Sequence, residues 1–321
     1  MLGHRLLSTV TSHNTPTALY YFSAGGTTYV LKVEFGQGQT LRDEIQWYRD
    51  AARISLPREL FVGSHIGKNF SFVLLKYFGD GSTVDDAALA GAPAHELGRH
   101  IVRALHGEAE LFERTKRSAT SAQMHLLVTR RYDQRRTQAL AFPYLRRLMD
   151  ARFVTVNGES LHGPAHCWSR TADAKPILEY LTPRQVGMTF GDLHCGNILI
   201  GGSSTEVVDP RGGALLPVTY DYGKLVQSIE GDYGAIMAGR YVLRRPADGE
   251  YEFAADSTAG YAGLATLMAE HCDERLYLQS LYQAALHFSA MLPHHASAEE
   301  ETTALYLSGT VLFNKLLARL A

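Results

Sequence analysis

Apolar runs at the start of the chain predict a small β-rich unit with one helix. The segment 18–35 holds two runs rich in Tyr, Phe, Val and Leu, separated by Ala-Gly-Gly, and therefore predicts a β-hairpin. Apolar residues at positions 41, 45 and 48 recur at helical spacing and predict a helix over 40–53. A further apolar run begins at residue 70 and ends in Gly-Asp-Gly, a composition typical of a turn. The strand-rich unit is therefore expected to end near residue 79.

Helical periodicity dominates the rest of the chain. Apolar side chains recur at helical spacing through 85–150, and the segment 255–321 has the same character. The stretch 151–180 shows no clear period and is predicted to be irregular. Short strands are expected at 186–190 and on both sides of the Gly-Gly-Ser-Ser turn that begins at residue 201. This pattern predicts a mainly helical C-terminal unit.

Composition and charge restrict the class of protein. With 321 residues and 45% hydrophobic residues, the chain can bury a substantial core, and its net charge of −2 provides no global positive field for a nucleic-acid backbone. The N-terminus is too polar for a secretion signal, and no run approaches the ~18 apolar residues of a membrane span. Three scattered cysteines suit a reducing compartment rather than a disulfide framework. We therefore expect a cytoplasmic protein that binds neither nucleic acid nor membrane.

The stretch TFGDLHCGNILI at 189–200 places polar side chains between two apolar runs. Phosphoryl transfer needs a carboxylate that orients the attacking hydroxyl, oxygen ligands for Mg²⁺ and a lysine near the nucleotide phosphates. That set is present as Asp192, Asn197, Asp209 and Lys32. Asp192 and Asn197 are five residues apart on a predicted tight loop, and the hairpin that follows would return Asp209 to the same pocket. These residues therefore indicate a site for phosphoryl transfer.

The loop that begins at Gly191 has the pattern Gly-Asp-x-His-x-x-Asn. Here the sequence resembles the aminoglycoside phosphotransferase and choline kinase-like family, part of the protein-kinase-like superfamily. The segments VVDPRG and YDYGKL resemble in addition the bacterial sugar and polysaccharide-associated phosphotransferases. The resemblance implies an α+β, bilobal protein-kinase-like fold with a small antiparallel-sheet N-lobe and a larger, mainly helical C-lobe. Residues 1–79 would form the nucleotide-binding lobe, and residues 80–321 the catalytic and acceptor-binding lobe.

The same resemblance implies a role for each residue of the site. Asp192 would be the catalytic base, and Asn197 and Asp209 would bind Mg²⁺. Lys32 would hold the α- and β-phosphates of ATP and pair with Glu44. The sequence leaves GTP open as an alternative donor.

The adenine of the nucleotide is expected at the strand around 74–78, where Leu75 and Tyr77 would offer backbone groups. Three features depart from the family pattern. Lys76 occupies a position in this strand where relatives often have an acidic residue. Pro-Arg-Gly follows Asp209, where a protein kinase has Phe-Gly. The segment 8–17, which would cover the phosphates, contains no glycine.

Several polar residues have a structural alternative to a role in chemistry. His194 is expected to bond to the backbone or to Asp221, and Asp221 to be a buried support of the catalytic loop. A zinc site would need to use His162, His166, Cys167, His194 and Cys195. The spacing of these five residues does not fit a closed tetrahedral site, and Cys195 is better explained as a small residue that fills the loop.

The sequence leaves two interpretations open for each of two basic clusters. The arginines at 130, 131, 135 and 136 are typical of a solvated helix face, and the alternative is that some of them attract an anionic sugar phosphate or uronic acid. His294 and His295 could line the acceptor pocket or lie in a loop between helices.

These observations predict an ATP-dependent phosphotransferase that acts on a hydroxyl of a small molecule, with a sugar or sugar-like metabolite preferred. The alternatives are a protein kinase, a non-catalytic nucleotide-binding protein and a nucleotidyltransferase. Only eleven residues separate Asp209 from Asp221, too few for the extended segment on which a protein kinase docks a peptide. A non-catalytic protein would have no physical need to keep all five ionic and metal-binding groups, which are Lys32, Glu44, Asp192, Asn197 and Asp209. Local pattern encodes neither the identity of the acceptor nor the oligomeric state.

Overall fold

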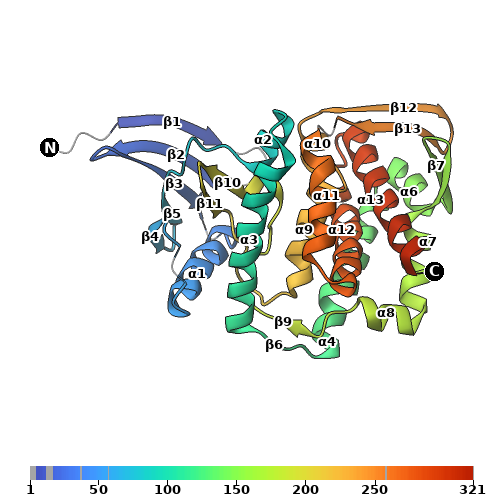
Figure 1. Ribbon diagram of the computed structural model, residues 1–321, viewed down its shortest axis with the longest axis horizontal. Coiled ribbons are helices and arrows are strands. Elements are labelled where there is room, and N and C mark those ends of the chain that lie inside the picture. The colour runs from blue at the N-terminus through green and yellow to red at the C-terminus, as the bar shows by residue number, and fades with distance from the viewer. Residues whose placement is uncertain (1–4, 12–16, 37, 57, 257–258, 321) are drawn as a thin grey trace.

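The computed structural model of the protein describes residues 5–11, 17–36, 38–56, 58–256 and 259–320. Its N-lobe is a five-stranded antiparallel sheet in the order β1-β2-β3-β5-β4 (Figure 1). The strands are β1 (Arg5–Thr11), β2 (Thr17–Ala24), β3 (Thr27–Phe35), β4 (Phe61–Ile66) and β5 (Phe70–Lys76). The helix α1 (Thr40–Arg53) contacts β4 and β5. The predicted hairpin and the predicted helix of this lobe are thus confirmed.

The β2–β3 hairpin places Lys32 in the middle of the sheet. Gly25 and Gly26 form its two-residue turn with φ angles of 58° and 80°, a conformation that suits the right-handed twist of the strands and favours glycine. In the resulting register Lys32 lies between Leu19 of β2 and Val73 of β5. The cover predicted over the phosphates at 8–17 lies partly outside the described residues, which resume at Thr17.

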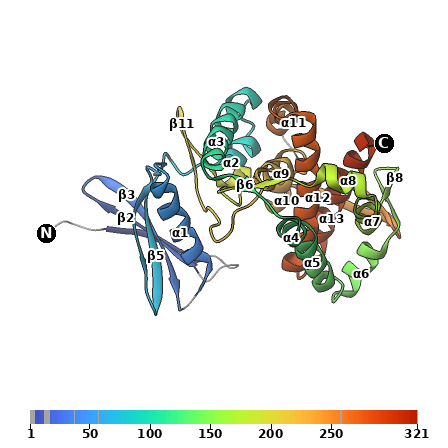
Figure 2. The same cartoon turned by 90° about the horizontal axis from the view of Figure 1, so that it is seen from below.

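Helices form most of the C-lobe, with α12 (Glu274–His295) at its centre. This helix packs against α5 (Arg131–Ala139), α9 (Val218–Ile229) and α13 (Glu299–Leu320). The helices α11 (Ala259–His271) and α3 (Ala94–Thr115) pack on each other, and α3 lies beside the N-lobe (Figures 1 and 2). Within the described ranges, no helix combines the length and apolar character needed to cross a bilayer.

Shorter elements connect these helices. They are α2 (Val84–Leu89), β6 (Arg117–Ser118), α4 (Ser121–His125), a π-helical turn (Leu126–Arg130), α6 (Pro143–Asp150), β9 (Gln185–Val186) and α10 (Tyr233–Met237). The strand expected at 186–190 is shorter than predicted, because β9 ends at Val186 and Gly187 forms an isolated bridge with Leu216.

The stretch 151–180 has regular structure, so the prediction of an irregular segment is wrong. It contains β7 (Phe153–Val156), β8 (Glu159–His162), α7 (Pro164–Asp173) and α8 (Lys175–Leu181). With β12 (Tyr241–Ala247) and β13 (Glu250–Ala255) the two strands form a sheet in the order β12-β13-β7-β8. Each of the first two strands is too short to show a period, although Asn157-Gly158, with φ angles of 54° and 83°, is a hairpin signal in the sequence.

A second hairpin carries polar residues to the junction of the lobes. It consists of β10 (Ile198–Gly201) and β11 (Ser204–Val207), as predicted from the Gly-Gly-Ser-Ser turn. Gly79, which follows β5, packs so closely on this hairpin that a Cβ atom there would lie 2.6 Å from the Ile200 carbonyl oxygen. Arg58 forms an ion pair of 2.7 Å with Glu206 of β11. The N-lobe therefore contacts the hairpin that leads to Asp209.

Trp47 of α1 connects the N-lobe to the segment that enters the catalytic loop. Its indole Nε1 donates a hydrogen bond of 2.6 Å to the carbonyl oxygen of Thr189, and its ring stacks on Phe190 with 5.3 Å between ring centroids. The side chain is 3% exposed. Because a buried indole N–H needs an acceptor, this contact fixes α1 relative to the catalytic loop.

We expect Trp47→Ala to lower the free energy of unfolding by roughly 3–5 kcal/mol, because it opens a cavity and leaves a carbonyl oxygen without its donor. Trp47→Phe keeps most of the packing and should lower it by about 1–2 kcal/mol. Chemical denaturation followed by circular dichroism measures both. The exposed Phe35 supplies the control Phe35→Ala, for which a change within ~0.5 kcal/mol is expected. Equal stability of Trp47→Ala and the control would contradict the role of this contact.

Candidate active site

A buried lysine joins three segments that are far apart in the sequence. The Nζ atom of Lys32 lies 3.0 and 2.9 Å from the two carboxylate oxygens of Glu44 on α1, and 2.5 Å from Oδ1 of Asp209, which follows β11. Lys32 and Glu44 are 8% and 5% exposed. The pairing of Lys32 with Glu44 agrees with the sequence-based expectation. The contact with Asp209 adds a second carboxylate to this ion pair.

Burial and the neighbouring charges shift the pKa values of Lys32 and Glu44 in opposite directions. Burial favours the neutral amine of Lys32, but the charges of Glu44 and Asp209 outweigh it and raise the pKa of the lysine above its usual range. For Glu44, burial dominates over the neighbouring ammonium and raises the pKa of the carboxyl group to about 7. The lysine is therefore a permanent cation in the site, and a second anion such as a phosphate can take the place of a carboxylate beside it.

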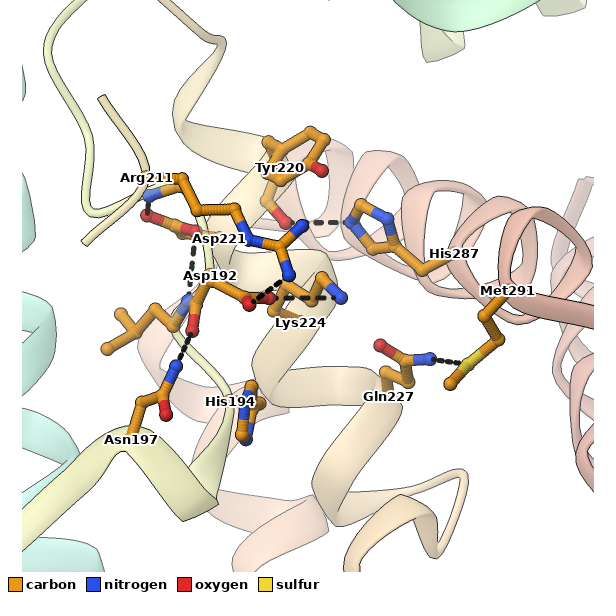
Figure 3. A network of polar contacts seen from close by, with 12 residues as sticks. Asp192, His194, Asn197, Arg211, Tyr220, Asp221, Lys224, Gln227, His287 and Met291 are labelled. Atoms are coloured by element: carbon orange, nitrogen blue, oxygen red, sulfur yellow. Dashed lines mark hydrogen bonds and ion pairs between the residues drawn. The ribbon is translucent and has the colours of Figure 1, made fainter. Parts of the chain in front are cut away.

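Asp192 lies on the loop after Phe190 and is held by two cations (Figure 3). Its Oδ2 atom is 2.7 Å from Nη2 of Arg211, and its Oδ1 atom is 3.1 Å from Nζ of Lys224 on α9. Burial raises the pKa of this carboxyl group, but Lys224 and Arg211 outweigh burial and hold the pKa well below its usual range. Asp192 is therefore ionised at neutral pH and can accept a hydrogen bond from a hydroxyl group.

Asn197 and Asp209 are neighbours at the open ends of the β10–β11 hairpin. The amide Nδ2 of Asn197 donates to the backbone oxygen of Asp192 at 2.9 Å, which directs its one donor group inward. The backbone N–H of Val208 donates to the carbonyl oxygen of Asn197 at 3.0 Å, so the two strands bring the residues together. Asp209 has a φ angle of 56°, and its side chain is 55% exposed.

These two residues present oxygen atoms, the ligand type that Mg²⁺ prefers. Asn197 retains its amide oxygen, and Asp209 retains the carboxylate oxygen that does not contact Lys32. A magnesium ion of a nucleotide complex is usually bound by one or two protein oxygens together with phosphates and water. The donor set of the site fits that arrangement.

Two buried carboxyl groups support the backbone of the catalytic loop. Asp221 of α9 accepts hydrogen bonds from the N–H groups of Gly191 and Leu193, at 2.7 and 3.1 Å, and it is fully buried. This is the supporting role predicted for it. Glu108 of α3 accepts a hydrogen bond of 3.0 Å from the N–H of Phe190 and is also fully buried.

Glu108 is a site residue that sequence reasoning missed. Burial, and next the charge of Asp221, raise the pKa of Glu108 well above its usual range, which favours the protonated form of this carboxyl group. The signal was present in the sequence, because position 108 continues the apolar face of α3 formed by Ile101, Leu105 and Phe112. A carboxyl group on the buried face of a helix needs a polar partner.

His194 and Cys195 have structural roles in the loop. The Nδ1 atom of His194 accepts a hydrogen bond of 3.1 Å from the N–H of Gly196, in agreement with the prediction of a bond to the backbone. Burial is the main cause that lowers the pKa of this imidazole. Cys195 is fully buried, and burial raises the pKa of its thiol well above the usual range.

Of the five residues considered for zinc, His194 and Cys195 lie in the catalytic loop, whereas His162, His166 and Cys167 lie on β8 and α7. His162 and His166 have ring centroids 4.7 Å apart, near β8 and α7. Burial raises the pKa of the neighbouring Cys167 thiol to about 12, which disfavours the thiolate that zinc requires. Across the described part of the chain, no three His, Cys, Asp or Glu side chains come together in a group that could hold a metal ion.

The strand expected to contact adenine lies at the junction of the lobes. Leu75 is buried, and Tyr77 is partly exposed with its hydroxyl donating to the carbonyl oxygen of Asp80 at 2.7 Å. The backbone N–H of Tyr77 donates to the carbonyl oxygen of Thr28 at 2.9 Å. This N–H is therefore engaged within the sheet, and an adenine contact at Leu75 and Tyr77 stays a prediction.

The two basic clusters also have defined places. His294 and His295 form the last turn of α12 rather than a loop, and Nδ1 of His295 lies 2.6 Å from a carboxylate oxygen of Glu301. Arg131 is not only part of a solvated helix face, because it donates a hydrogen bond of 2.5 Å to the hydroxyl of Tyr220.

Solved structures with the same fold cover almost the whole chain. A glucosamine kinase in complex with glucosamine, ADP and inorganic phosphate is 17% identical, with 97% of this chain and 76% of that chain covered and a TM-score of 0.54. A thermostable mutant of the aminoglycoside phosphotransferase APH(4)-Ia is 10% identical, with 97% and 95% covered and a TM-score of 0.57. The spectinomycin phosphotransferase APH(9)-Ia, in complex with ADP and spectinomycin, is 13% identical, with 97% and 88% covered and a TM-score of 0.50.

These similarities establish the α+β, bilobal protein-kinase-like fold that the sequence predicted. No curated protein sequence matches the chain. The family model described as the phosphotransferase enzyme family matches residues 17–261, a range that includes every residue of the site described above. Because this match covers most of the chain, the protein belongs to the phosphotransferase enzyme family.

Proposed function

We propose that the protein is an ATP-dependent kinase that transfers the γ-phosphoryl group to a hydroxyl of a small molecule, preferably a sugar or sugar-like metabolite. The observation that carries the proposal is the convergence of Lys32 and Asp209, 177 residues apart, beside the loop that holds Asp192 and Asn197. Membership of the phosphotransferase enzyme family supports the reaction class.

Residues of both lobes hold the nucleotide in this proposal. Residues 1–79 bind ATP, with Lys32 on the phosphates and the strand at 74–78 beside the adenine. Asn197 and Asp209 bind Mg²⁺, which when bound neutralises charge on the phosphates. The complexes of a glucosamine kinase and a spectinomycin phosphotransferase with ADP support an adenine nucleotide, with GTP as the alternative donor.

Asp192 orients the acceptor in the C-lobe, residues 80–321. Its carboxylate accepts a hydrogen bond from the acceptor hydroxyl and takes the proton as the oxygen–phosphorus bond forms and ADP leaves. Lys224 and Arg211 keep this carboxylate ionised and compensate for the cost of its burial. Asp221 and Glu108 hold the loop backbone, so the carboxylate needs little rearrangement before reaction.

The structure after Asp209 favours a small-molecule acceptor over a peptide acceptor. After Asp209, the segment 210–217 leads directly into α9, and the bridge between Leu216 and Gly187 fixes its end. This leaves no extended segment for a peptide. The neighbouring kinases with glucosamine or spectinomycin bound support a compact hydroxyl compound. The cytoplasmic location expected from the cysteine content stays a prediction.

An assay of which class of compound accepts the phosphate tests this proposal. We expect labelled phosphate from γ-labelled ATP to enter small molecules of a metabolite extract and not proteins of a protein extract. Mass spectrometry of the product should show the addition of one phosphate, which also distinguishes a kinase from a nucleotidyltransferase. Label that enters only proteins would establish the protein kinase instead. Mg-ATP binding without transfer to either pool would favour the non-catalytic alternative.

Asp192→Asn tests the base. The amide keeps the shape of the side chain but cannot accept the proton, so turnover should fall by roughly 10²–10⁴-fold while Mg-ATP binding persists. Steady-state kinetics and calorimetry measure the two quantities. Asp173→Asn, an equal change at an exposed position of α7, is the control. Turnover close to that of the unmodified protein would remove Asp192 from this role.

Asp209→Ala tests the metal site. It removes one of two oxygen ligands, so Mg-ATP should bind more weakly and transfer should be lost, whereas binding of ATP without Mg²⁺ should change much less. Calorimetry with and without Mg²⁺ gives this comparison. Asp256→Ala, which removes an exposed partner of Arg240, is the control. Unchanged Mg-ATP affinity together with retained activity would contradict the assignment.

A further inference from the structure

A continuous arc of basic and polar groups surrounds Asp192 on the C-lobe side of the site. Arg211 and Lys224 flank the carboxylate at 2.7 and 3.1 Å. Figure 3 shows the Arg211 guanidinium between Asp192 and Tyr220, and the charge of Arg211 interacts with both. Tyr220 and Lys224 are four residues apart on α9 and therefore share one face of the helix.

Arg131 of α5 extends this arc away from the nucleotide. Its Nη1 atom donates to the Tyr220 hydroxyl at 2.5 Å, and its guanidinium carbon lies 5.6 Å from the centre of the tyrosine ring. Tyr220 is itself fixed by His287 of α12, whose ring is 4.5 Å from the tyrosine ring and whose Nε2–H donates to the Tyr220 carbonyl oxygen at 3.0 Å. The exposed guanidinium of Arg131 is thus held in place by Tyr220, which His287 fixes in turn.

The end of α12 belongs to the same basic region. Burial lowers the pKa of the His294 imidazole, and the charges of Arg135, His295, Arg131 and Arg211 lower it further. His295 is already paired with Glu301. Among the described residues, Asp192 is the carboxylate found in ion pairs with Arg211 and Lys224. Two cations, Arg211 and Lys224, therefore share the carboxylate of Asp192, and Arg131 contacts the hydroxyl of Tyr220.

The donor half of the reaction does not account for these cations. Lys32, Asn197 and Asp209 serve the phosphates and the metal in the proposed function, and they approach from the N-lobe and the β10–β11 hairpin. The Arg211 side chain is 56% exposed and is a planar donor suited to a bidentate bond with a carboxylate or phosphate. A cationic acceptor would be repelled by the guanidinium groups of Arg131 and Arg211, whereas an anionic group could bind them in addition to their contacts with Tyr220 and Asp192.

We propose that the acceptor carries an anionic group, a phosphate or a carboxylate, which Arg131 and Arg211 bind while Asp192 engages the hydroxyl. This inference rests on the proposed kinase function. The hydroxyl oxygen of the anionic acceptor bonds to the γ-phosphorus of ATP, the bond to ADP breaks, and Asp192 takes the hydroxyl proton. Lys224 remains beside Asp192 and the transferring phosphoryl group.

A direct binding experiment separates the acceptor site from the phosphate site of the nucleotide. Protein saturated with Mg²⁺ and AMP-PNP, which occupies the γ-phosphate position, is titrated with sulfate, methyl phosphate and acetate in a calorimeter. We expect one saturable anion site, and the stronger of methyl phosphate and acetate indicates whether a phosphate or a carboxylate is preferred. Arg131→Gln should weaken that binding roughly tenfold, the loss expected for one charge-assisted hydrogen bond. Arg244→Gln, the same change at an exposed position of β12, should leave it unchanged.

Kinetics supply the second arm, with matched acceptors that differ in charge: glucuronate, glucose 6-phosphate, glucose and glucosamine. ADP release above the acceptor-free rate should be greatest with an anionic member, and Arg131→Gln should raise its KM with little change in kcat. Absence of a saturable anion site, equal anion binding by Arg131→Gln, or preferential phosphorylation of glucose or glucosamine would each overturn the inference. Failure of AMP-PNP to bind with Mg²⁺ would instead overturn the proposed function, so the two failures are distinguishable.

Discussion

The burial of the Lys32 ammonium constrains the rest of the site. Removing a cation from water is costly, and the cost is compensated only if carboxylates meet it at hydrogen-bond distance. Glu44 and Asp209 do so at 2.5–3.0 Å, and they bring together a central strand, a helix and the loop after β11. The close approach has a steric counterpart at Gly212, where a Cβ atom would lie 1.9 Å from the backbone oxygen of Asp43. The glycine of the Pro-Arg-Gly segment is thus required by the contact between this loop and α1.

The catalytic loop depends on a second group of buried charges. Asp221 and Glu108 bind the N–H groups of Phe190, Gly191 and Leu193, so hydrogen bonds fix the loop backbone in addition to the packing of its buried apolar side chains. The raised pKa of Glu108 favours its protonated form, and this reduces the electrostatic cost of burying two carboxyl groups together. The loop is therefore held in place from α3 and α9, and its side chains remain directed to the site.

In the proposed function, different parts of the molecule determine the reaction class and the choice of acceptor. The groups proposed to bind phosphate and metal lie on β3, on α1 and at the ends of the β10–β11 hairpin, and phosphoryl transfer requires groups of these types. The charge around the acceptor position comes from Arg211 beside Asp192 and from Arg131, which α5 places against Tyr220 of α9. On this proposal, a change in these helices would alter which compound binds without altering the transfer step, and one fold could then serve acceptors of different charge.

The sequence alone determined the local elements and the chemistry of the loop. The hairpin at 18–35, the helix at 40–53 and the Gly-Asp-x-His-x-x-Asn segment are encoded by neighbouring residues, because turn composition, periodicity and motif spacing are local properties. The tertiary structure alone decided which charges surround Asp192. Lys224, Arg211 and the Arg131–Tyr220 contact join residues separated by up to 89 positions, and the parallel pairing of β13 with β7 joins strands almost a hundred residues apart. Such contacts leave no periodic trace in the chain, since they depend on how helices and strands pack once they have formed.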